Sequence, residues 1–560
     1  MVKNLFSLLN KGTFFTIISL SFLILYVVSL FLNLGVAPFY NEEPRRSIIA
    51  MEMLSNKNFV VTTLFNDVFY DHPPLWNIIL AGSSWLFGTD TEFAFRFPSA
   101  LSLLLTGILV YFIGKKYVGH VFGTVSAFLY MVSIDLYFFF SNTAEIDIFF
   151  SLLILASIMG IYHFYEQKKF VSLYLYAYFF CFLGFLTKGV VSLVFLGISL
   201  LVFFIYKKDY KKLFLPVHFL SIFLCLGGIA VFFYVYGQYD DVYAYMEGMW
   251  RITRNKSFLD EQNNAFLSHF LWFPLNMLGN LFPATLLIPF LFKKSVILKI
   301  KENPYIIFLI SIFFSNFIIY WLSPGAKARY TYMFYPMLIS ILTFAFLIEK
   351  HKKGWKTKLL FGVLSAISLL LGVSCFILPF IDHLDTVKGV TFFGILFGFG
   401  GLILFLLQLK TYNMWNRLVF GLMGIVMFKL VFSLTVYPLK QQKSSSSSFK
   451  KHAKNILGIT KDSPIYLFSE LGFFGHHEIG KFYTTGAYLE LLGNQIPKKT
   501  SSYKEKGYYI LHKEELKGQK VLYTIDNRTS CLVLIKNEEE HAETWSHIPE
   551  LPPYQSEALR

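Results

Sequence analysis

Cysteine and charge are both scarce in this chain. Only 4 of its 560 residues are cysteine, and Asp, Glu, Lys and Arg together make up 15%. Cys181, Cys225 and Cys375 lie in apolar runs and Cys531 stands alone, which excludes a disulfide framework and a cysteine metal knuckle. A chain with so little charge and with 55% hydrophobic residues is not an ordinary soluble globular domain.

Long apolar runs recur up to about residue 437. A helix needs roughly 20 apolar residues to cross a hydrocarbon layer of about 30 Å. The first run is longer than a signal-peptide core and no small-residue cleavage site follows it, so we interpret it as a retained span. Residues 1–437 are therefore predicted to form an all-α polytopic membrane region of about thirteen transmembrane helices, near residues 13–35, 97–113, 119–138, 146–165, 171–187, 189–206, 213–236, 270–292, 304–322, 330–348, 357–380, 389–408 and 417–437.

The formal net charge of +15 indicates orientation rather than nucleic-acid binding. Lys and Arg cluster between the apolar runs, as at Lys115–Lys116 and Lys293–Lys294, and these clusters share one side if every run crosses once. That side and the N-terminus are predicted to be cytoplasmic. The stretch 74–88 starts after a proline pair and has only about 15 residues, so we expect an interfacial helix. The outward loops are then 36–75, 139–147 and 237–269.

The sequence becomes less apolar after residue 437. Residues 438–450 contain the run Ser444–Ser448 and are predicted to be a flexible linker. Beyond it, short β-like runs at 465–468, 508–511 and 531–535 alternate with charged stretches. We expect residues 451–560 to form a small, soluble, extracytoplasmic α/β domain. No internal repeat of fixed period is visible, which disfavours a repeat-built transporter.

The first outward loop combines two carboxylates with basic side chains. In the run from Asn41 to Arg46, Glu42 and Glu43 stand beside Arg45. Carboxylates can activate a nucleophile while a guanidinium holds a phosphate. The alternative is a solvated loop that neutralises its own charge.

Two further charged residues stand at the ends of apolar runs. A carboxylate at the depth of Asp147 is costly without a role or a partner, although Asn142, Thr143 or Asp147 itself could cap the following helix. Lys188 has no nearby counter-charge in the sequence and could bind a lipid phosphate, or it could extend to the lipid head groups.

These motifs together resemble the bacterial GT-C glycosyltransferases related to protein O-mannosyltransferases and to the aminoarabinose transferase of lipid A. The resemblance extends over about residues 15–345, and the motifs occur in the family's order. The matching segments are Glu42-Glu43-Pro44-Arg45 with Glu52-Met53-Leu54, His72-Pro73-Pro74-Leu75, Arg96-Phe97-Pro98-Ser99-Ala100, Asp147, Phe185–Gly189, and Arg329-Tyr330 with Tyr335-Pro336.

The resemblance implies a GT-C fold in a cell membrane and a sugar donor carried on a polyprenyl phosphate. It also implies transfer, with inversion, to a protein, lipid A or glycan acceptor on the extracytoplasmic face. Among the residues that match the family's motifs, Glu42, Glu43 and Asp147 are expected to be catalytic, Arg45, His72, Lys188 and Arg329 to bind the donor phosphate, and Tyr330 to contact substrate. Arg251 and Arg254 match no motif; in the loop 237–269 they could close over donor or acceptor, or could belong to a basic juxtamembrane loop.

Two departures from the family's motifs limit this assignment. Glu42 replaces the usual aspartate and is one methylene longer, so the base is either Glu42 or Glu43. No histidine stands at the usual place in the 237–269 loop, because His269 is displaced towards the next apolar run. No metal ligand is therefore assigned with assurance, although carboxylates with His72 could hold a divalent ion.

Three other functions compete with a transferase. A lipid or sugar transporter or flippase would place ionisable residues near the middle of the membrane, whereas the charges here stand at the ends of the runs. A lipid-linked oligosaccharide ligase would use the same donor lipid and differ only in its motifs. A membrane scaffold without activity would tolerate conservative changes at Glu42 or Asp147.

Overall fold

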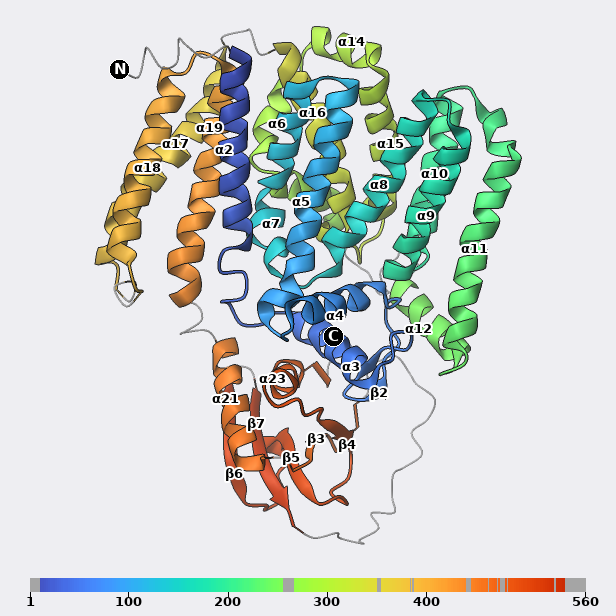
Figure 1. The fold of residues 1–560 in the computed structure, drawn as a ribbon, viewed down its shortest axis with the longest axis vertical. Coiled ribbons are helices and arrows are strands. Elements are labelled where there is room, and N and C mark those ends of the chain that lie inside the picture. The colour runs from blue at the N-terminus through green and yellow to red at the C-terminus, as the bar shows by residue number, and fades with distance from the viewer. Residues whose placement is uncertain are drawn as a thin grey trace. The chain divides into compact units, whose positions relative to one another are not determined.

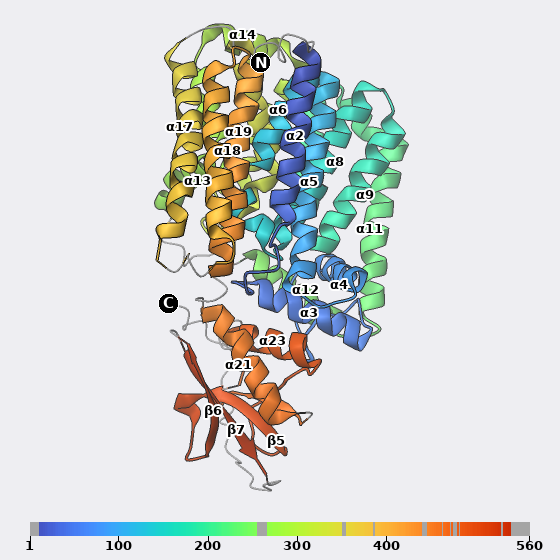
Figure 2. The same ribbon diagram turned by 60° about the vertical axis from the view of Figure 1, so that its left-hand side comes forward.

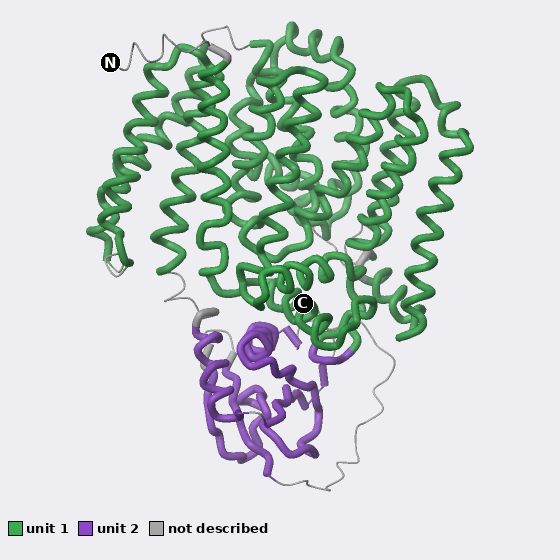
Figure 3. Tube along the Cα trace, in the orientation of Figure 1, with its two compact units in different colours: residues 1–64, 68–447 green, residues 65–67, 448–560 purple. Residues whose placement is uncertain are grey.

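The computed structural model describes residues 11–254, 266–349, 354–382, 384, 387–439, 445–461, 463–470, 472–473, 479–480, 482–527 and 530–538. The chain divides into two compact units, as Figure 3 shows. The first contains residues 1–64 and 68–447, and the second contains residues 65–67 and 448–560.

The first unit is a bundle of long apolar helices (Figure 1). Within the described residues, ten helices are long and apolar enough to cross a membrane, or up to twelve if each of two bent helix pairs is one span. A thirteenth predicted run corresponds to α10, which is apolar but has only 16 residues. The predicted polytopic all-α fold is thus confirmed, with helices α2 (Lys11–Phe31), α5 (Glu92–Tyr117), α6 (His120–Met131), α7 (Ile134–Phe138), α8 (Ile146–Glu166), α9 (Phe170–Lys188), α10 (Val191–Tyr206), α11 (Pro216–Tyr236), α13 (Phe266–Asn280), α15 (Pro304–Trp321), α16 (Tyr335–Glu349), α17 (Trp355–Ile377), α18 (Val390–Lys410) and α19 (Met414–Val431).

Shorter helices gather at the two ends of the bundle. Figures 1 and 2 show α3 (Glu43–Asn56), α4 (Leu75–Phe87) and α12 (Val242–Arg254) at one end and α14 (Lys294–Glu302) at the other. The predicted interfacial segment 74–88 corresponds to α4, which follows the proline pair and ends at Gly88 in the left-handed conformation. Lys115 and Lys116, in the last turn of α5, lie at the end of the bundle that carries α14. We call the opposite end, which carries α3, α4 and α12, the outer end.

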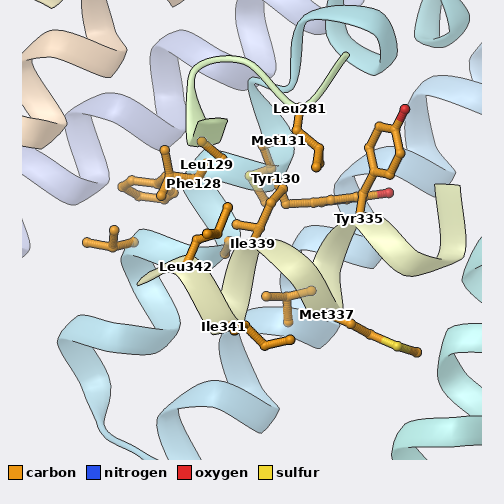
Figure 4. Close-up of a cluster of buried hydrophobic side chains, with 14 of the residues drawn as sticks. Phe128, Leu129, Tyr130, Met131, Leu281, Tyr335, Met337, Ile339, Ile341 and Leu342 are labelled. Carbon is orange, nitrogen blue, oxygen red and sulfur yellow. The ribbon is translucent and has the colours of Figure 1, made fainter. Parts of the chain in front are cut away.

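Large apolar side chains interlock across the middle of the bundle. In Figure 4, Phe128, Leu129 and Met131 of α6 lie against Ile339 and Leu342 of α16. All five are buried. Their burial removes apolar surface from contact with solvent or lipid and fixes the positions of α6 and α16.

Glycine allows α17 and α18 to approach closely. A Cβ atom at Gly401 would lie 2.7 Å from the backbone of Gly372. Small residues at such a crossing let helix backbones pack tightly where lipid provides no hydrophobic driving force.

The second unit contains a five-stranded mixed sheet. The strand order is β4 (Lys498–Thr500), β3 (Ile465–Phe468), β5 (Gly507–His512), β7 (Ser530–Asn537) and β6 (Val521–Asn527). β3 pairs in parallel with β4 and β5, whereas β7 is antiparallel to β5 and β6. Helices α21 (Ser445–Thr460) and α23 (Tyr483–Gly493) also belong to this part of the chain. The three predicted strands thus lie within β3, β5 and β7.

The linker prediction differs from the structure over part of its length. Residues 440–444 lie outside the described residues, but helix α21 begins at Ser445. Ser445–Ser448 therefore form the first turn of a helix. The described part of the serine-rich run therefore begins a helix and is not a flexible linker.

A buried ion pair ties α5 to the start of α3. Arg96 Nε lies 2.7 Å from Glu43 Oε1, and Arg96 Nη2 lies 2.9 Å from Glu43 Oε2. The guanidinium also donates to the carbonyl oxygens of Leu34, Ala37 and Pro38, at 2.7–2.9 Å. All five of its N–H groups are therefore used.

Replacing Arg96 by methionine should strongly destabilise the first unit. Glu43 would keep a buried charge without its partner, a change that costs about 3–5 kcal/mol. We expect a large drop in the thermal unfolding temperature of Arg96→Met in detergent, with partial recovery in Arg96→Met/Glu43→Leu. Arg251→Met, at an exposed position on α12, is the control. Equal unfolding temperatures for Arg96→Met and the control would contradict this assignment.

Candidate functional site

Five residues between α2 and α4 form a charged cluster, which we call the first-loop cluster: Glu42, Arg45, Arg46, Asp71 and His72. Arg45 Nη2 lies 2.7 Å from Glu42 Oε2. Asp71 Oδ2 lies 3.5 Å from Arg45 Nη1 and 3.1 Å from Arg46 Nη1, and His72 Nε2 is 4.0 Å from Asp71 Oδ1. The Asp71 carboxylate thus joins both arginines of α3 to the segment that leads into α4.

A second group, the span-end cluster, brings together Glu145, Asp147, Lys188 and Arg329. Asp147 stands in the first turn of α8, and Lys188 is the last residue of α9. Arg329 comes from the 3-10 helix η4 (Ala328–Phe334). Lys188 Nζ donates a hydrogen bond to Asp147 Oδ1. Arg329 Nη1 lies 3.4 Å from Glu145 Oε1, and its Nε lies 3.5 Å from Asp147 Oδ2.

The contacts of Arg329 are long for a charge-assisted hydrogen bond, which is usually about 2.7–2.9 Å. Its Nε is buried and makes no hydrogen bond within the described part of the chain. Lys188 Nζ lies 4.9 Å from the centre of the Tyr330 ring and 5.2 Å from that of Phe150. A cation held among aromatic rings, beside an arginine with a free donor, is suited to bind a phosphate.

Glu145, a member of the span-end cluster, also interacts electrostatically with residues of the first-loop cluster. Besides Arg329 and Asp147, it lies within electrostatic range of Arg46 and Glu42. Burial raises the pKa of the Glu145 carboxyl from 4.5 to about 7, and the nearby arginines only partly oppose this shift. Burial also lowers the pKa of Arg46. The two clusters therefore act as one interacting set of charges.

Carboxylates and cations balance in this set. The carboxylates Glu42, Asp71, Glu145 and Asp147 each face a lysine or an arginine. A divalent cation would have to displace these protein cations, so the donor set does not fit a resident metal ion. No group of three His, Cys, Asp or Glu side chains with metal-binding geometry occurs among the described residues.

The structure distinguishes Glu42 from Glu43. Glu43 is fully buried, and besides Arg96 it accepts hydrogen bonds from the backbone N–H groups of Tyr40 and Ala144, both at 2.9 Å. The Glu42 side chain is 37% exposed. Glu42 can therefore meet a substrate, whereas Glu43 is occupied in holding the fold.

The structure argues against two alternatives, that Asp147 caps α8 and that Lys188 extends to the lipid head groups. The residue that caps α8 is Glu145, and it makes no side-chain capping hydrogen bond. The Asp147 oxygens face Lys188 and Arg329 instead. The Lys188 side chain is only 9% exposed, so it is paired within the protein rather than extended to head groups.

Most of the predicted site residues come together in these two clusters. Tyr330 adjoins the span-end cluster through its ring. Arg251 and Arg254 are exposed on α12, and residues 255–265 of the same loop lie outside the described residues. His269, on α13, lies 3.0 Å from the carbonyl oxygen of Tyr320.

Sequence reasoning missed Asp71 and Glu145. Each carried a local signal, since Asp71 directly precedes the His72-Pro73-Pro74 motif and Glu145 stands two residues before Asp147. Arg46 was noted only as part of the charged loop, although only 3% of its surface is exposed in the structure.

Known proteins are similar in sequence to the part of the chain that contains this site. Residues 71–235 match the family described as dolichyl-phosphate-mannose-protein mannosyltransferase. The undecaprenyl phosphate-alpha-4-amino-4-deoxy-L-arabinose arabinosyl transferase of Yersinia enterocolitica is 30% identical over 208 residues, which are 37% of this chain and 37% of that protein. The Yersinia pseudotuberculosis enzyme of the same name is 29% identical over 210 residues, again 37% of each chain. The chain thus matches little more than a third of the length of these curated relatives.

The fold is shared over a much longer stretch. The crystal structure of ArnT from Cupriavidus metallidurans bound to undecaprenyl phosphate superimposes with a TM-score of 0.66 at 13% identity, covering 92% of this chain and 97% of that one. The apo state of the same protein gives a TM-score of 0.64 at 14% identity, with the same coverage. The predicted resemblance and the predicted GT-C type fold are both confirmed.

The raised pKa of Glu145 gives the protein a measurable pH dependence. Between about pH 4.5 and about 7, the folded state binds more protons than the unfolded state, so the Glu145 contribution to stability falls as pH rises. We expect the unfolding temperature in detergent to fall more from about pH 5 to about pH 8 in the wild type than in Glu145→Gln.

Glu302→Gln, on the exposed surface of α14, is the matched control and should keep the wild-type slope. Identical slopes for the wild type and Glu145→Gln would show that Glu145 ionises normally.

Proposed function

We propose that this chain is a membrane glycosyltransferase. It moves a sugar from a polyprenyl-phosphate donor to an acceptor at the outer end of the bundle. The observation that carries this proposal is the meeting of two cations, Lys188 and Arg329, with the carboxylates of both clusters at that end. The family match and the named relatives support the same reaction class, since those relatives are transferases and not transporters.

The cations and the carboxylates have separate tasks in the proposed reaction. In the transition state the anomeric carbon becomes oxocarbenium-like, the bond to the donor phosphate breaks, and the phosphate gains negative charge. In this proposal Lys188 and Arg329, with Arg45 and His72 from the first loop, stabilise that leaving group, which is supported by their meeting with the carboxylates of the two clusters. Glu42 takes the proton of the attacking hydroxyl, because it is the accessible carboxylate. A single displacement inverts the anomeric centre.

Asp147 orients Lys188 and Arg329 in this scheme rather than accepting the proton itself. Its two oxygens face those two cations. Tyr330 adds an aromatic ring beside Lys188, and Arg251 and Arg254 on α12 are candidates for contacts with the substrate at the edge of the site. The protein cations then do the work that a metal ion would otherwise do at the phosphate.

Turnover of a defined donor tests the proposal. Purified protein in lipid nanodiscs is incubated with a panel of polyprenyl-phosphate sugars and membrane acceptors, and release of polyprenyl phosphate is measured. We expect Glu42→Gln to lower the rate by about 10²–10⁴-fold, as for loss of a general base. Asp147→Asn should lower it as well, and turnover should persist in EDTA.

Glu302→Gln serves as the control with wild-type activity, since its side chain is exposed on α14. Full activity in both Glu42→Gln and Asp147→Asn would refute the proposed site. A requirement for a divalent ion would refute the role given to the protein cations.

We infer further that the outer end faces away from the cytoplasm, with the N-terminus cytoplasmic and the C-terminal unit extracytoplasmic. The basic clusters at the α14 end support this orientation, because short cytoplasmic loops are rich in Lys and Arg.

Reporter fusions test this orientation. Alkaline phosphatase fused after residue 560 should be active, whereas the same enzyme inserted beside Lys294 should be inactive. A fluorescent protein that matures only in the cytoplasm should give the opposite pattern. The reverse result for both reporters would overturn the orientation.

A further inference from the structure

A lysine is buried inside the last long helix of the bundle. Lys429 stands in the last turn of α19, and only 1% of its surface is exposed. The candidate membrane span that contains it continues to Leu439, so Lys429 lies well inside the span rather than at its end. An ionisable side chain at such a depth is costly to bury, and it is kept where it has a partner and a role.

The partners of Lys429 are uncharged. Its Nζ donates a hydrogen bond to the carbonyl oxygen of Tyr137 and a second one, of 3.3 Å, to the hydroxyl oxygen of Ser141. Nζ also lies 4.2 Å from the centre of the Tyr137 ring. Within the part of the chain that the structure describes, no carboxylate forms an ion pair with Lys429. Lys429 differs in this respect from Lys188, whose partner is Asp147.

Both partners belong to the turn that leads into the span-end cluster. Tyr137 lies near the end of α7, and Ser141 lies in the 3-10 helix η1 (Phe140–Asn142). The last carbonyl groups of a helix lack an intrahelical donor, and a lysine side chain can supply one. Glu145 follows Ser141 by four residues, and Asp147 stands two residues further on. Lys429 therefore holds the chain just before both carboxylates of the cluster.

The two sides of this contact are both tied to the region of α2. Directly after α19, residues Phe432–Val436 form a π-helical turn, a feature that occurs frequently at functional sites. The side-chain amide of Asn33 donates a hydrogen bond of 2.8 Å to the carbonyl oxygen of Ser433 in this turn. The hydroxyl of Tyr137 forms a hydrogen bond with that of Ser29 on α2. The end of α19 and the end of α7 are therefore held against the same element.

We infer that Lys429 is a positioning residue of the proposed transferase. It fixes the turn between α7 and α8, so that Glu145 and Asp147 meet the two cations of the span-end cluster. The inference rests on the proposed function, because the side chains that it places are those of the proposed site. Glu43 holds the same turn at the backbone N–H of Ala144, so the turn is fixed at two points.

A lysine suits this task because its Nζ carries several N–H donors at the end of a long, thin side chain. It can therefore serve a carbonyl and a hydroxyl group on a neighbouring element at once. Methionine has nearly the same length and is apolar but has no donor. Lys429→Met thus keeps most of the packing and removes the hydrogen bonds.

Hydrogen–deuterium exchange measures the turn without any substrate. Full-length wild type, Lys429→Met and Lys410→Met are compared in nanodiscs. Lys410→Met is the matched control, because Lys410 is exposed at the end of α18. We expect the backbone N–H groups of residues 139–147 to exchange about tenfold faster in Lys429→Met, as for loss of a hydrogen bond, while those of α5 stay unchanged. Control-like exchange in 139–147, or faster exchange throughout the bundle, would overturn the inference.

Chemical rescue separates the donor from the volume of the side chain. Lys429→Ala removes the atoms that propylamine can replace. With release of polyprenyl phosphate as the assay, we expect Lys429→Ala to lower kcat by about tenfold to a hundredfold, as for a misplaced catalytic group, and to change KM for the donor less. Propylamine should restore most of the loss. Ethyl methyl ether has the same number of heavy atoms but no N–H, and it should not.

Equal rescue by the amine and the ether would show a packing role and would overturn the inference, as would a wild-type kcat in both Lys429→Met and Lys429→Ala. Glu42→Gln separates this inference from the proposed function. It should transfer little sugar, while residues 139–147 exchange as in the wild type. If Glu42→Gln keeps full activity, the proposed catalytic site fails, and the exchange of Lys429→Met still decides whether Lys429 fixes the turn.

Discussion

The Arg96–Glu43 ion pair fixes the geometry on which the outer end depends. It joins α5, the segment after α2 and the start of α3, and Glu43 also accepts a hydrogen bond from the backbone N–H of Ala144. Glu42 directly precedes Glu43, and Glu145 directly follows Ala144. The relative positions of these two carboxylates are therefore set by one buried pair. In a poorly solvated environment, separating such a pair costs several kcal/mol, roughly 3–5, so the outer end is held in one arrangement before any substrate binds.

Every carboxylate of the two clusters is paired with a cation, so an anionic ligand has to compete with these carboxylates for the cations. A free anion must compete with Glu145 and Asp147 for Arg329, and with Asp147 for Lys188. Stray anions therefore gain little from this site. In the proposed reaction a leaving phosphate gains charge as its bond to the sugar breaks, so its contacts with the two cations would strengthen in the transition state. Interactions of that kind lower the barrier rather than only tightening binding.

The sequence predicted the architecture well because bilayer thickness sets the length of a spanning helix. Each predicted apolar run coincides with a helix or bent helix pair of the first unit, and the segment 74–88 coincides with α4. The motifs named Glu42, Asp147, Lys188 and Arg329. The sequence could not separate Glu42 from Glu43, because burial of adjacent residues depends on Arg96, some fifty positions away. It could not predict the contact between Asp135 and Tyr332, which no motif marks, because that contact joins α7 to η4 across nearly two hundred positions of the sequence. Serine content likewise suggested a linker where α21 begins.

The short helix η4 contacts two separate groups of carboxylates. Arg329 faces Glu145 and Asp147, and Tyr332, three residues later, donates a hydrogen bond to Asp135. Residues three positions apart in a 3-10 helix lie on the same side of it. The position of Arg329 in the span-end cluster is therefore linked, through one turn of η4, to the contact that Tyr332 makes with α7. A change that displaces η4 would disturb both contacts together.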